Sequence, residues 1–167
     1  MAITCGMGGI GDLRGEELCP DLPALMNIPV ALISTSPKDM LDRPATLDWL
    51  RRHGVHTAGE PCTGYLFCGE PVALELPLSS CNNEAAVRRL TANGGLLLLN
   101  PIPEKERVQD RSILVDAIKA GKQAEAEGHY YHPAANGEID RRTDGYSSRI
   151  QLESIQQNYL LAKSIMD

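Results

Sequence analysis

The sequence predicts an α/β fold with a mainly parallel sheet that is flanked by helices. Two segments, residues 29–35 ("PVALIST") and residues 95–103 ("GLLLLNPIP"), contain short continuous apolar runs that are typical of buried strands. Helical patterns alternate with these strands, and this alternation favours a parallel sheet. Both strands end at polar turns that contain proline, so we expect their loops to leave from the same edge of the sheet.

The first half of the chain begins with "AITCGMGGIG", which predicts a strand that runs into a glycine-rich turn. "DLPALMNI" then predicts a short helix or turn. After the strand at residues 29–35, Asp42 is expected to cap the helix "ATLDWLRRHG", which Gly54 ends. Residues 55–77 are rich in glycine and proline, and we expect an irregular excursion from the sheet with short β-like pieces.

In the second half, Ser80 is expected to cap the helix "NEAAVRRLTANG", which ends at Gly94. A long helix follows the second strand, from about residue 110 to residue 127, and "HPAANGEIDRRTDG" predicts a short helix or turn. The last helix is expected over about residues 147–166. Its predicted apolar stripe consists of Leu152, Ile155, Tyr159, Ala162 and Met166.

Length and composition predict one globular α/β domain over residues 1–167, since the chain has 43% hydrophobic residues and shows no internal repeat. The net charge of −6 argues against a nucleic-acid partner, which would need a basic face. The longest apolar run, residues 96–99, is far too short to span a membrane. The N-terminus lacks the pattern of a signal peptide, and five cysteines without a Cys-x-x-Cys pair predict a reduced, cytoplasmic protein.

Lys38 stands just past the carboxyl end of the strand that is predicted at residues 29–35. Open α/β sheets place their ligand chemistry at this position. An ordinary solvated loop lysine would occupy the same position, so the residues alone leave both interpretations open.

Two further segments carry possible ligand groups. The run "GMGGIG", residues 6–11, would let backbone N–H groups approach an anion, although a tight turn without a ligand has the same pattern. Glu16, Glu17 and Asp21 would suit a hard divalent cation, or they belong to a solvated acidic loop.

Two asparagines are also candidates for ligand contact. Asn100 ends the strand predicted at residues 95–103, and Asn158 lies in mid-helix, where a buried amide needs partners. A ligand is one such partner.

Together these segments resemble one family, the pseudouridine-5′-phosphate glycosidases, which are also called the indigoidine synthase A family. The resemblance rests on "GGIG", on the strand followed by Lys38, on "LDRPATLDWLRRHGV" and on "NGGLLLLNPIPE", and it spans nearly the whole chain. It implies that the chain corresponds to the later part of a family domain. The family's general-acid glutamate and further phosphate-binding groups then belong to a preceding part.

The resemblance also implies roles for individual residues. Lys38 falls on the nucleophile that forms a Schiff base with C1′ of the opened ribose, and Asn158 falls on an active-site asparagine. Glu17 falls on the ligand of a manganese ion, a site that magnesium would also suit. The substrate-contacting positions are Gly8, Gly9, Cys19, Pro20 and Asp21. Met7 and Leu13 replace polar residues of the family pattern.

The expected function is therefore a pseudouridine-5′-phosphate glycosidase-like activity. Its partner would be a small-molecule nucleotide or ribose phosphate, with neither nucleic acid nor membrane involved. The alternatives are an inactive sugar-phosphate-binding or scaffold protein on the same fold, and a different Schiff-base lyase. Family members are trimers, so we expect a homo-oligomer, or a partner chain that supplies the earlier part of the domain.

Overall fold

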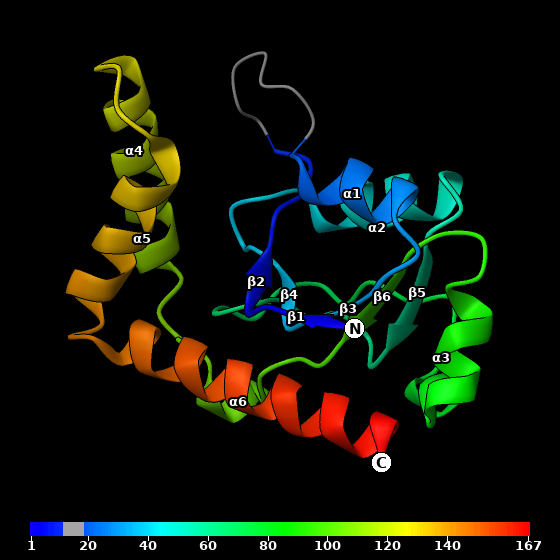
Figure 1. Ribbon diagram of the computed structural model, residues 1–167. Coiled ribbons are helices and arrows are strands. Elements are labelled where there is room, and N and C mark those ends of the chain that lie inside the picture. Colours follow the sequence, from blue (N-terminus) through cyan, green and yellow to red (C-terminus); the bar gives the residue numbers. More distant parts are fainter. Residues whose placement is uncertain (12–18) are drawn as a thin grey trace.

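The structure is a computed structural model that describes residues 1–11 and 19–167. Its main sheet has four parallel strands in the order β1 (Ala2–Ile3), β3 (Ala31–Ser34), β6 (Leu96–Leu99) and β5 (His56–Gly59). Two further short strands, β2 (Gly6–Met7) and β4 (Ser36–Pro37), also pair in parallel. Figure 1 shows helices on both faces of the main sheet. The α/β class and the parallel sheet are confirmed.

The strand register places the ends of the central strands at one level. Ser34 lies opposite Leu99, and Leu99 lies opposite Gly59 on the other neighbouring strand. The loops that follow β3 and β6 therefore start from the same edge of the sheet, as predicted, and the loop after β5 starts from this edge too. Open parallel sheets bind their ligands at this carboxyl edge.

The helices are α1 (Asp21–Asn27), α2 (Arg43–Arg52), α3 (Glu84–Leu90), α4 (Ser112–Ala126), α5 (Tyr131–Arg142) and α6 (Tyr146–Met166). Two short 3₁₀ helices, η1 (Leu78–Cys81) and η2 (Glu104–Glu106), complete the elements. In Figure 1, α4 and α5 form a helical hairpin beside the sheet, and α6 runs below the sheet from this hairpin.

The core explains why β6 consists of four leucines. Leu97 and Leu99 pack with residues of α1 and α2, whereas Leu96 and Leu98 pack with residues of α3 and the end of α6. Successive side chains of a strand point to opposite faces, and both faces of this sheet are covered. All four leucines are therefore buried.

One predicted helix start is confirmed and another is wrong. The Asp42 carboxylate accepts the N–H of Ala45 at 2.9 Å and caps α2. Ser80, in contrast, lies within η1, and the side chain of Asn83 accepts the N–H of Ala86 and caps α3. A 3₁₀ turn after Pro77 uses the residues around Ser80, so the cap is Asn83, three residues later than predicted, while the helix itself begins close to the predicted start.

Residues 55–77 contain an element that the sequence analysis missed. His56–Gly59 forms the edge strand β5, although its residues are small or polar. The predicted β-like pieces at residues 65–67 and 72–76 contribute only isolated bridges, of Phe67 with Val108, of Val72 with Cys62 and of Leu76 with Ala58. Backbone pairing with β6, and not local apolar character, makes β5 a strand.

The predicted apolar stripe of α6 is also wrong. Leu152 and Tyr159 are 69% and 56% exposed, and Met166 is exposed as well. The buried side of this helix instead carries Ser147, Ile150, Ser154, Asn158 and Ile165. Polar contacts of Asn158 with the sheet orient the helix, which turns most of the predicted stripe outward. None of the helices in residues 1–11 and 19–167 has both the length and the hydropathy to cross a membrane.

Candidate active site at the carboxyl edge of the sheet

The glycine-rich loop after β2 packs closely against the start of α1. Gly8 donates its N–H to the Asp21 carboxylate at 2.7 Å. A side chain at position 8 would collide with the sulfur of Cys19, so glycine is required there. Gly9 is buried against the hydroxyl of Thr46. The structure thus brings Gly8, Cys19 and Asp21 together. The Asp21 carboxylate accepts the hydrogen bond from the Gly8 N–H, which an anionic ligand would otherwise accept.

Pro20 lies at the exposed N-terminal boundary of α1, between Cys19 and Asp21. No side-chain hydrogen bond caps this helix start. Three of the five positions expected to contact the substrate therefore sit at one helix terminus, and the other two, Gly8 and Gly9, lie in the adjacent glycine loop.

Lys38 follows β4 directly, on the strand pair that adjoins the main sheet. Its backbone N–H donates to the carbonyl oxygen of Met7 at 3.2 Å, which fixes the lysine beside the glycine loop. The side chain is half-buried, and its Cγ lies over the bare backbone of Gly6. Within residues 1–11 and 19–167, the Lys38 ammonium group makes no hydrogen bond and no ion pair.

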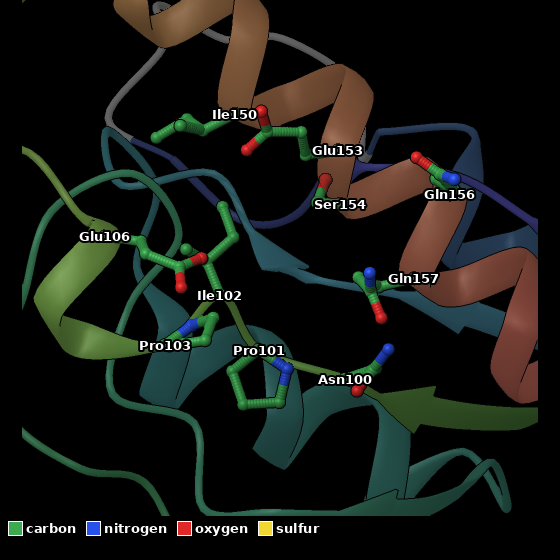
Figure 2. A pocket seen from close by; sticks show the side chains of 10 residues that line it. All are labelled: Asn100, Pro101, Ile102, Pro103, Glu106, Ile150, Glu153, Ser154, Gln156 and Gln157. Carbon is green, nitrogen blue, oxygen red and sulfur yellow. The ribbon is translucent and has the colours of Figure 1, made fainter.

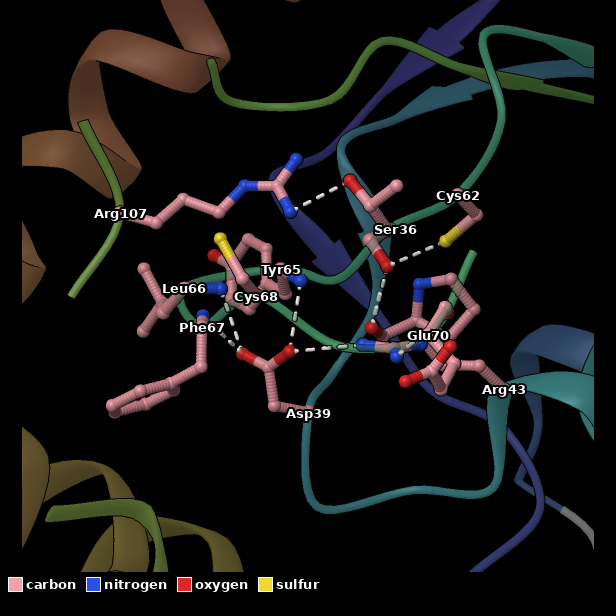
Figure 3. Close-up of polar contacts among 12 residues, drawn as sticks. Ser36, Asp39, Arg43, Cys62, Tyr65, Leu66, Phe67, Cys68, Glu70 and Arg107 are labelled. Atoms are coloured by element: carbon pink, nitrogen blue, oxygen red, sulfur yellow. Dashed lines mark hydrogen bonds and ion pairs between the residues drawn. The ribbon is translucent and has the colours of Figure 1, made fainter. Parts of the chain in front are cut away.

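Asp39, the next residue, is a buried carboxylate that holds the loop of residues 65–67 (Figure 3). Its two oxygens accept the backbone N–H groups of Tyr65 at 2.8 Å, Leu66 at 2.7 Å and Phe67 at 3.0 Å. Arg43 adds an ion pair at 3.3 Å. Burial raises the pKa of the Asp39 carboxyl, while the three N–H groups and the Arg43 charge act in the opposite direction.

Tyr65 extends from this loop toward α6. Its hydroxyl donates to the Oε1 atom of Gln151 at 3.0 Å, and the residue is only 3% exposed. Burial, together with the nearby Cys5 thiol, raises the pKa of the Tyr65 hydroxyl well above its usual range. The phenol is therefore a neutral hydrogen-bond donor and brings no negative charge to the site.

Arg107 is a second buried charged residue near this loop (Figure 3). Its guanidinium donates to the Thr63 hydroxyl at 2.9 Å, and two of its nitrogens donate to the carbonyl oxygen of Ile102. It thereby links the loop after β6 to the loop after β5. This link keeps both loops together at the carboxyl edge.

Asn158 is fully buried, and α6 aims it at the strand ends. Its Nδ2 donates to the carbonyl oxygen of Thr4 at 2.7 Å and to the Thr35 hydroxyl at 3.2 Å, while its Oδ1 accepts from Asn100 at 2.9 Å. The partners that a buried helical asparagine requires are therefore protein groups. Both amide hydrogens are used, so Asn158 has no hydrogen left to donate to a ligand in this arrangement.

A cavity of about 330 Å³ lies between α6 and the loop after β6 (Figure 2). Asn100, Gln156 and Gln157 supply amide groups, and Glu106 and Glu153 supply carboxylates. Prolines and isoleucines form the apolar part of its wall. None of the described residues that line it is basic, so the cavity suits uncharged or cationic groups better than a phosphate.

The predicted metal ligand, Glu17, lies outside the described residues, as does Leu13. The described part of the chain contains no group of three or more His, Cys, Asp or Glu side chains arranged to hold a metal ion. The manganese or magnesium site stays a prediction, and no chemical step below depends on a metal.

The predicted residues therefore form neighbouring groups along one edge. The glycine loop connects Lys38, through Met7, to the cluster of Gly8, Cys19 and Asp21. Asn158 reaches Thr35, three residues before Lys38. No hydrogen bond joins the side chains of Lys38 and Asn158.

A family model described as "Indigoidine synthase A like protein" matches residues 1–166 of the chain. The chain belongs to the indigoidine synthase A-like family. The resemblance that the sequence motifs indicated is thus confirmed.

Among proteins of this family, the pseudouridine-5′-phosphate glycosidase of Geobacillus kaustophilus is 25% identical over 174 residues, covering 97% of this chain and 58% of the relative. The pseudouridine-5′-phosphate glycosidase of Escherichia coli K12 is 29% identical over 181 residues, covering 97% of this chain and 56% of the relative. The chain thus spans a little more than half the length of these relatives.

Two solved structures share the fold. An indigoidine synthase A-like protein of Thermotoga maritima aligns with a TM-score of 0.73 at 21% identity, covering 98% of this chain and 57% of that chain. The prealnumycin C-glycosynthase AlnA, solved with ribulose 5-phosphate, aligns with a TM-score of 0.71 at 23% identity, covering 97% and 56%. Both confirm the predicted α/β architecture.

Sequence reasoning missed two residues that shape the site of this indigoidine synthase A-like chain. Asp39 has no distinguishing pattern, because an aspartate beside a lysine in a predicted loop is normally solvated. Tyr65 did offer a signal. It is one of few aromatic residues in the chain, and it stands in an irregular segment where a large side chain needs a partner to pack against.

Proposed function

We propose that this chain is a pseudouridine-5′-phosphate glycosidase-like protein in which Lys38 forms a Schiff base with C1′ of a ribose 5-phosphate moiety. The observation that carries the proposal is the position of Lys38. It stands at the carboxyl edge of a parallel sheet, half-buried beside a glycine loop, and its ammonium group is unengaged within the described residues. The named activity of the relatives and the sugar phosphate bound by AlnA support it.

A lysine nucleophile suits the cleavage of a carbon–carbon glycosidic bond. The neutral amine displaces the ring oxygen at C1′, which opens the ribose and leaves C1′ bonded to both the lysine nitrogen and the base. When the bond between C1′ and the base breaks, its electron pair stays on the base carbon, and the lone pair of the lysine nitrogen stabilises C1′ as an iminium ion that water then hydrolyses. The carbon of the base gains a proton as the bond breaks, and the resemblance assigns the glutamate that would supply this proton to a preceding part of the family domain.

A second candidate is a sugar-phosphate-binding or scaffold protein without catalysis. Two observations favour it. Asn158 has both amide hydrogens bound to protein groups, and Asp21 occupies the N–H of Gly8. The predicted homo-oligomer or partner chain remains a prediction under both candidates, and the exposed apolar residues Leu152, Tyr159 and Leu160 on α6 are consistent with such an assembly.

Reductive trapping tests the proposal. Incubation with ribose 5-phosphate and borohydride is expected to add one sugar to the chain, and peptide mapping should place it on Lys38. Lys119, which is exposed and pairs with Asp116, is an internal reference that should stay unlabelled. Lys38→Arg keeps the charge and should abolish the label. Label spread over all lysines, or absent from Lys38, would refute the Schiff-base role, and trapping without turnover of pseudouridine 5′-phosphate would indicate that proton transfer to the base, and not the nucleophile, limits the reaction.

We also propose weak manganese or magnesium binding near Glu17, whose carboxylate corresponds to the family's metal ligand. Hard cations bind carboxylate oxygen and accept water as the remaining ligands. Titration calorimetry with manganese should give a binding signal for the parent and a clearly smaller one for Glu17→Ala, while Glu104→Ala, in the exposed η2 turn, should match the parent. Equal signals for all three proteins would remove Glu17 from the metal site.

A further inference from the structure

We infer that Tyr65 is a positioning residue for Lys38, because its ring flanks the lysine stem and its hydroxyl ties this region to α6. The inference rests on the proposed role of Lys38 as the nucleophile. The two side chains meet over Gly6. The Cε1 and Cζ atoms of Tyr65 lie 2.8 and 2.9 Å, and the Cγ of Lys38 lies 3.1 Å, from the point that a Cβ on Gly6 would take.

The absence of a side chain at Gly6 therefore creates the space that both residues use. A methyl group at this point would be closer to the Tyr65 ring than real Cβ contacts allow, and closer to the Lys38 stem than most of them are. The lysine stem is thus confined near its root, while its amine is free of any hydrogen bond or ion pair to the described residues. Confinement of the stem limits the number of positions that the amine can take.

Tyr65 is itself held firmly. Its backbone N–H donates to Asp39, the residue that follows Lys38 in the chain. Its hydroxyl donates to Gln151 at 3.0 Å, and its ring is buried. The same short backbone segment therefore carries the lysine and anchors the tyrosine that flanks it. A shift of one of these residues would displace the other.

The hydroxyl contact extends this arrangement to α6. Gln151 and Asn158 are about two helical turns apart, so they lie on the same side of the helix. Asn158 bonds to Thr4 and Thr35 at the strand ends, and Gln151 bonds to Tyr65. Two sets of contacts thus join α6 to the region around Lys38, one through Tyr65 and one through Thr4 and Thr35.

The neutral state of the phenol fits a positioning role. Because burial raises the pKa of Tyr65, the hydroxyl keeps its hydrogen and the bond to Gln151 persists over the working pH range. Tyr65 places no anion beside the lysine, so it acts through packing and hydrogen bonding and not through charge.

The trapping reaction in the full chain tests this inference. At saturating ribose 5-phosphate, we expect Tyr65→Phe to slow the trapping of Lys38 about 10-fold and Tyr65→Leu about 100-fold. The half-saturating sugar concentration should not change, since nothing places Tyr65 in contact with the sugar. Gln151→Leu should match Tyr65→Phe, and the double variant should be no slower than either single variant, because both remove the same bond. Tyr159→Phe, an exposed tyrosine of α6, is the matched control and should trap at the parental rate.

A second readout needs no sugar and separates this inference from the proposed function. Competitive acetylation by acetic anhydride measures the reactivity of Lys38 relative to Lys119 by peptide mass spectrometry. Loss of the flanking ring in Tyr65→Leu should raise this ratio severalfold even if the parent forms no Schiff base. If the parent traps sugar and the Tyr65 and Gln151 variants trap it at the parental rate, or if the acetylation ratio stays constant, Tyr65 does not position Lys38. Should Tyr65→Leu not fold, Tyr65→Phe and Gln151→Leu preserve much of the packing and carry the test.

Discussion

Replacing Asp39 by alanine is expected to lower the free energy of unfolding by about 3–5 kcal/mol. The carboxylate is the acceptor for three consecutive backbone N–H groups, those of Tyr65, Leu66 and Phe67, and all three residues are buried. Buried donors without acceptors each cost about 1–3 kcal/mol. Arg43 would also lose its ion-pair partner, although its Nε atom is already buried without a hydrogen bond in the described part of the protein.

Urea denaturation followed by circular dichroism measures this loss. Asp48→Ala is a matched control, because Asp48 lies on the adjacent helix α2 and its ion pairs with Arg51 and Arg52 are exposed. Exposed pairs contribute about 0–1 kcal/mol, so this variant should stay near the parent. If Asp39→Ala lost no more stability than Asp48→Ala, the loop of residues 65–67 would not depend on Asp39.

Replacing Asn158 by leucine should cost about 2–4 kcal/mol of unfolding free energy. Leucine has a similar size but offers no hydrogen bond to the Thr4 carbonyl, the Thr35 hydroxyl or the Asn100 amide. The Thr35 hydroxyl can rotate to another partner, and Asn100 borders the cavity, where water can reach its amide. Most of the lost stability is therefore expected to come from the Thr4 carbonyl oxygen, which would be left without a hydrogen-bond donor.

The neighbouring residue provides the control for this variant. Gln157 is exposed on the same helix, and Gln157→Leu should change stability by no more than about 0.5 kcal/mol. The same denaturation experiment compares both variants. An Asn158→Leu protein as stable as the parent would mean that this amide is not committed to the protein and is available to a ligand.

The sequence was sufficient for those elements whose local pattern matches their final environment. β3 and β6 are continuous apolar runs, so their burial in the sheet could be predicted before their partners were known. β5 could not be predicted, because "HTAG" has no strand pattern and becomes a strand only by pairing with β6. The prediction that the apolar stripe of α6 would be buried failed for a related reason. Spacing alone cannot show that Asn158 will turn the helix toward the strand ends.

The candidate site shows the same division. The place of Lys38 after a strand and the proximity of the glycine loop follow from local sequence and from the parallel sheet. The burial of Asp39 depends on a loop 26 residues later that folds back onto it. The contact of Tyr65 with Gln151 joins residues 86 positions apart. No local pattern encodes such long-range contacts, and the family resemblance supplied roles only for residues that match its motifs.

The helical hairpin of α4 and α5 has a consequence for how the molecule opens. Each of these helices packs mainly against the other, and their apolar cluster joins the rest of the protein through residues 65–67, through Ile102 and Val108 after β6, and through Ile150 of α6. Because the two helices contact each other far more than they contact the sheet, the hairpin is expected to unfold in a separate step of lower free energy than the sheet. Amide hydrogens of the hairpin should then exchange through partial opening, whereas those of β3 and β6 exchange only when the whole chain unfolds. The loop held by Asp39 would be the boundary between these two cooperative units.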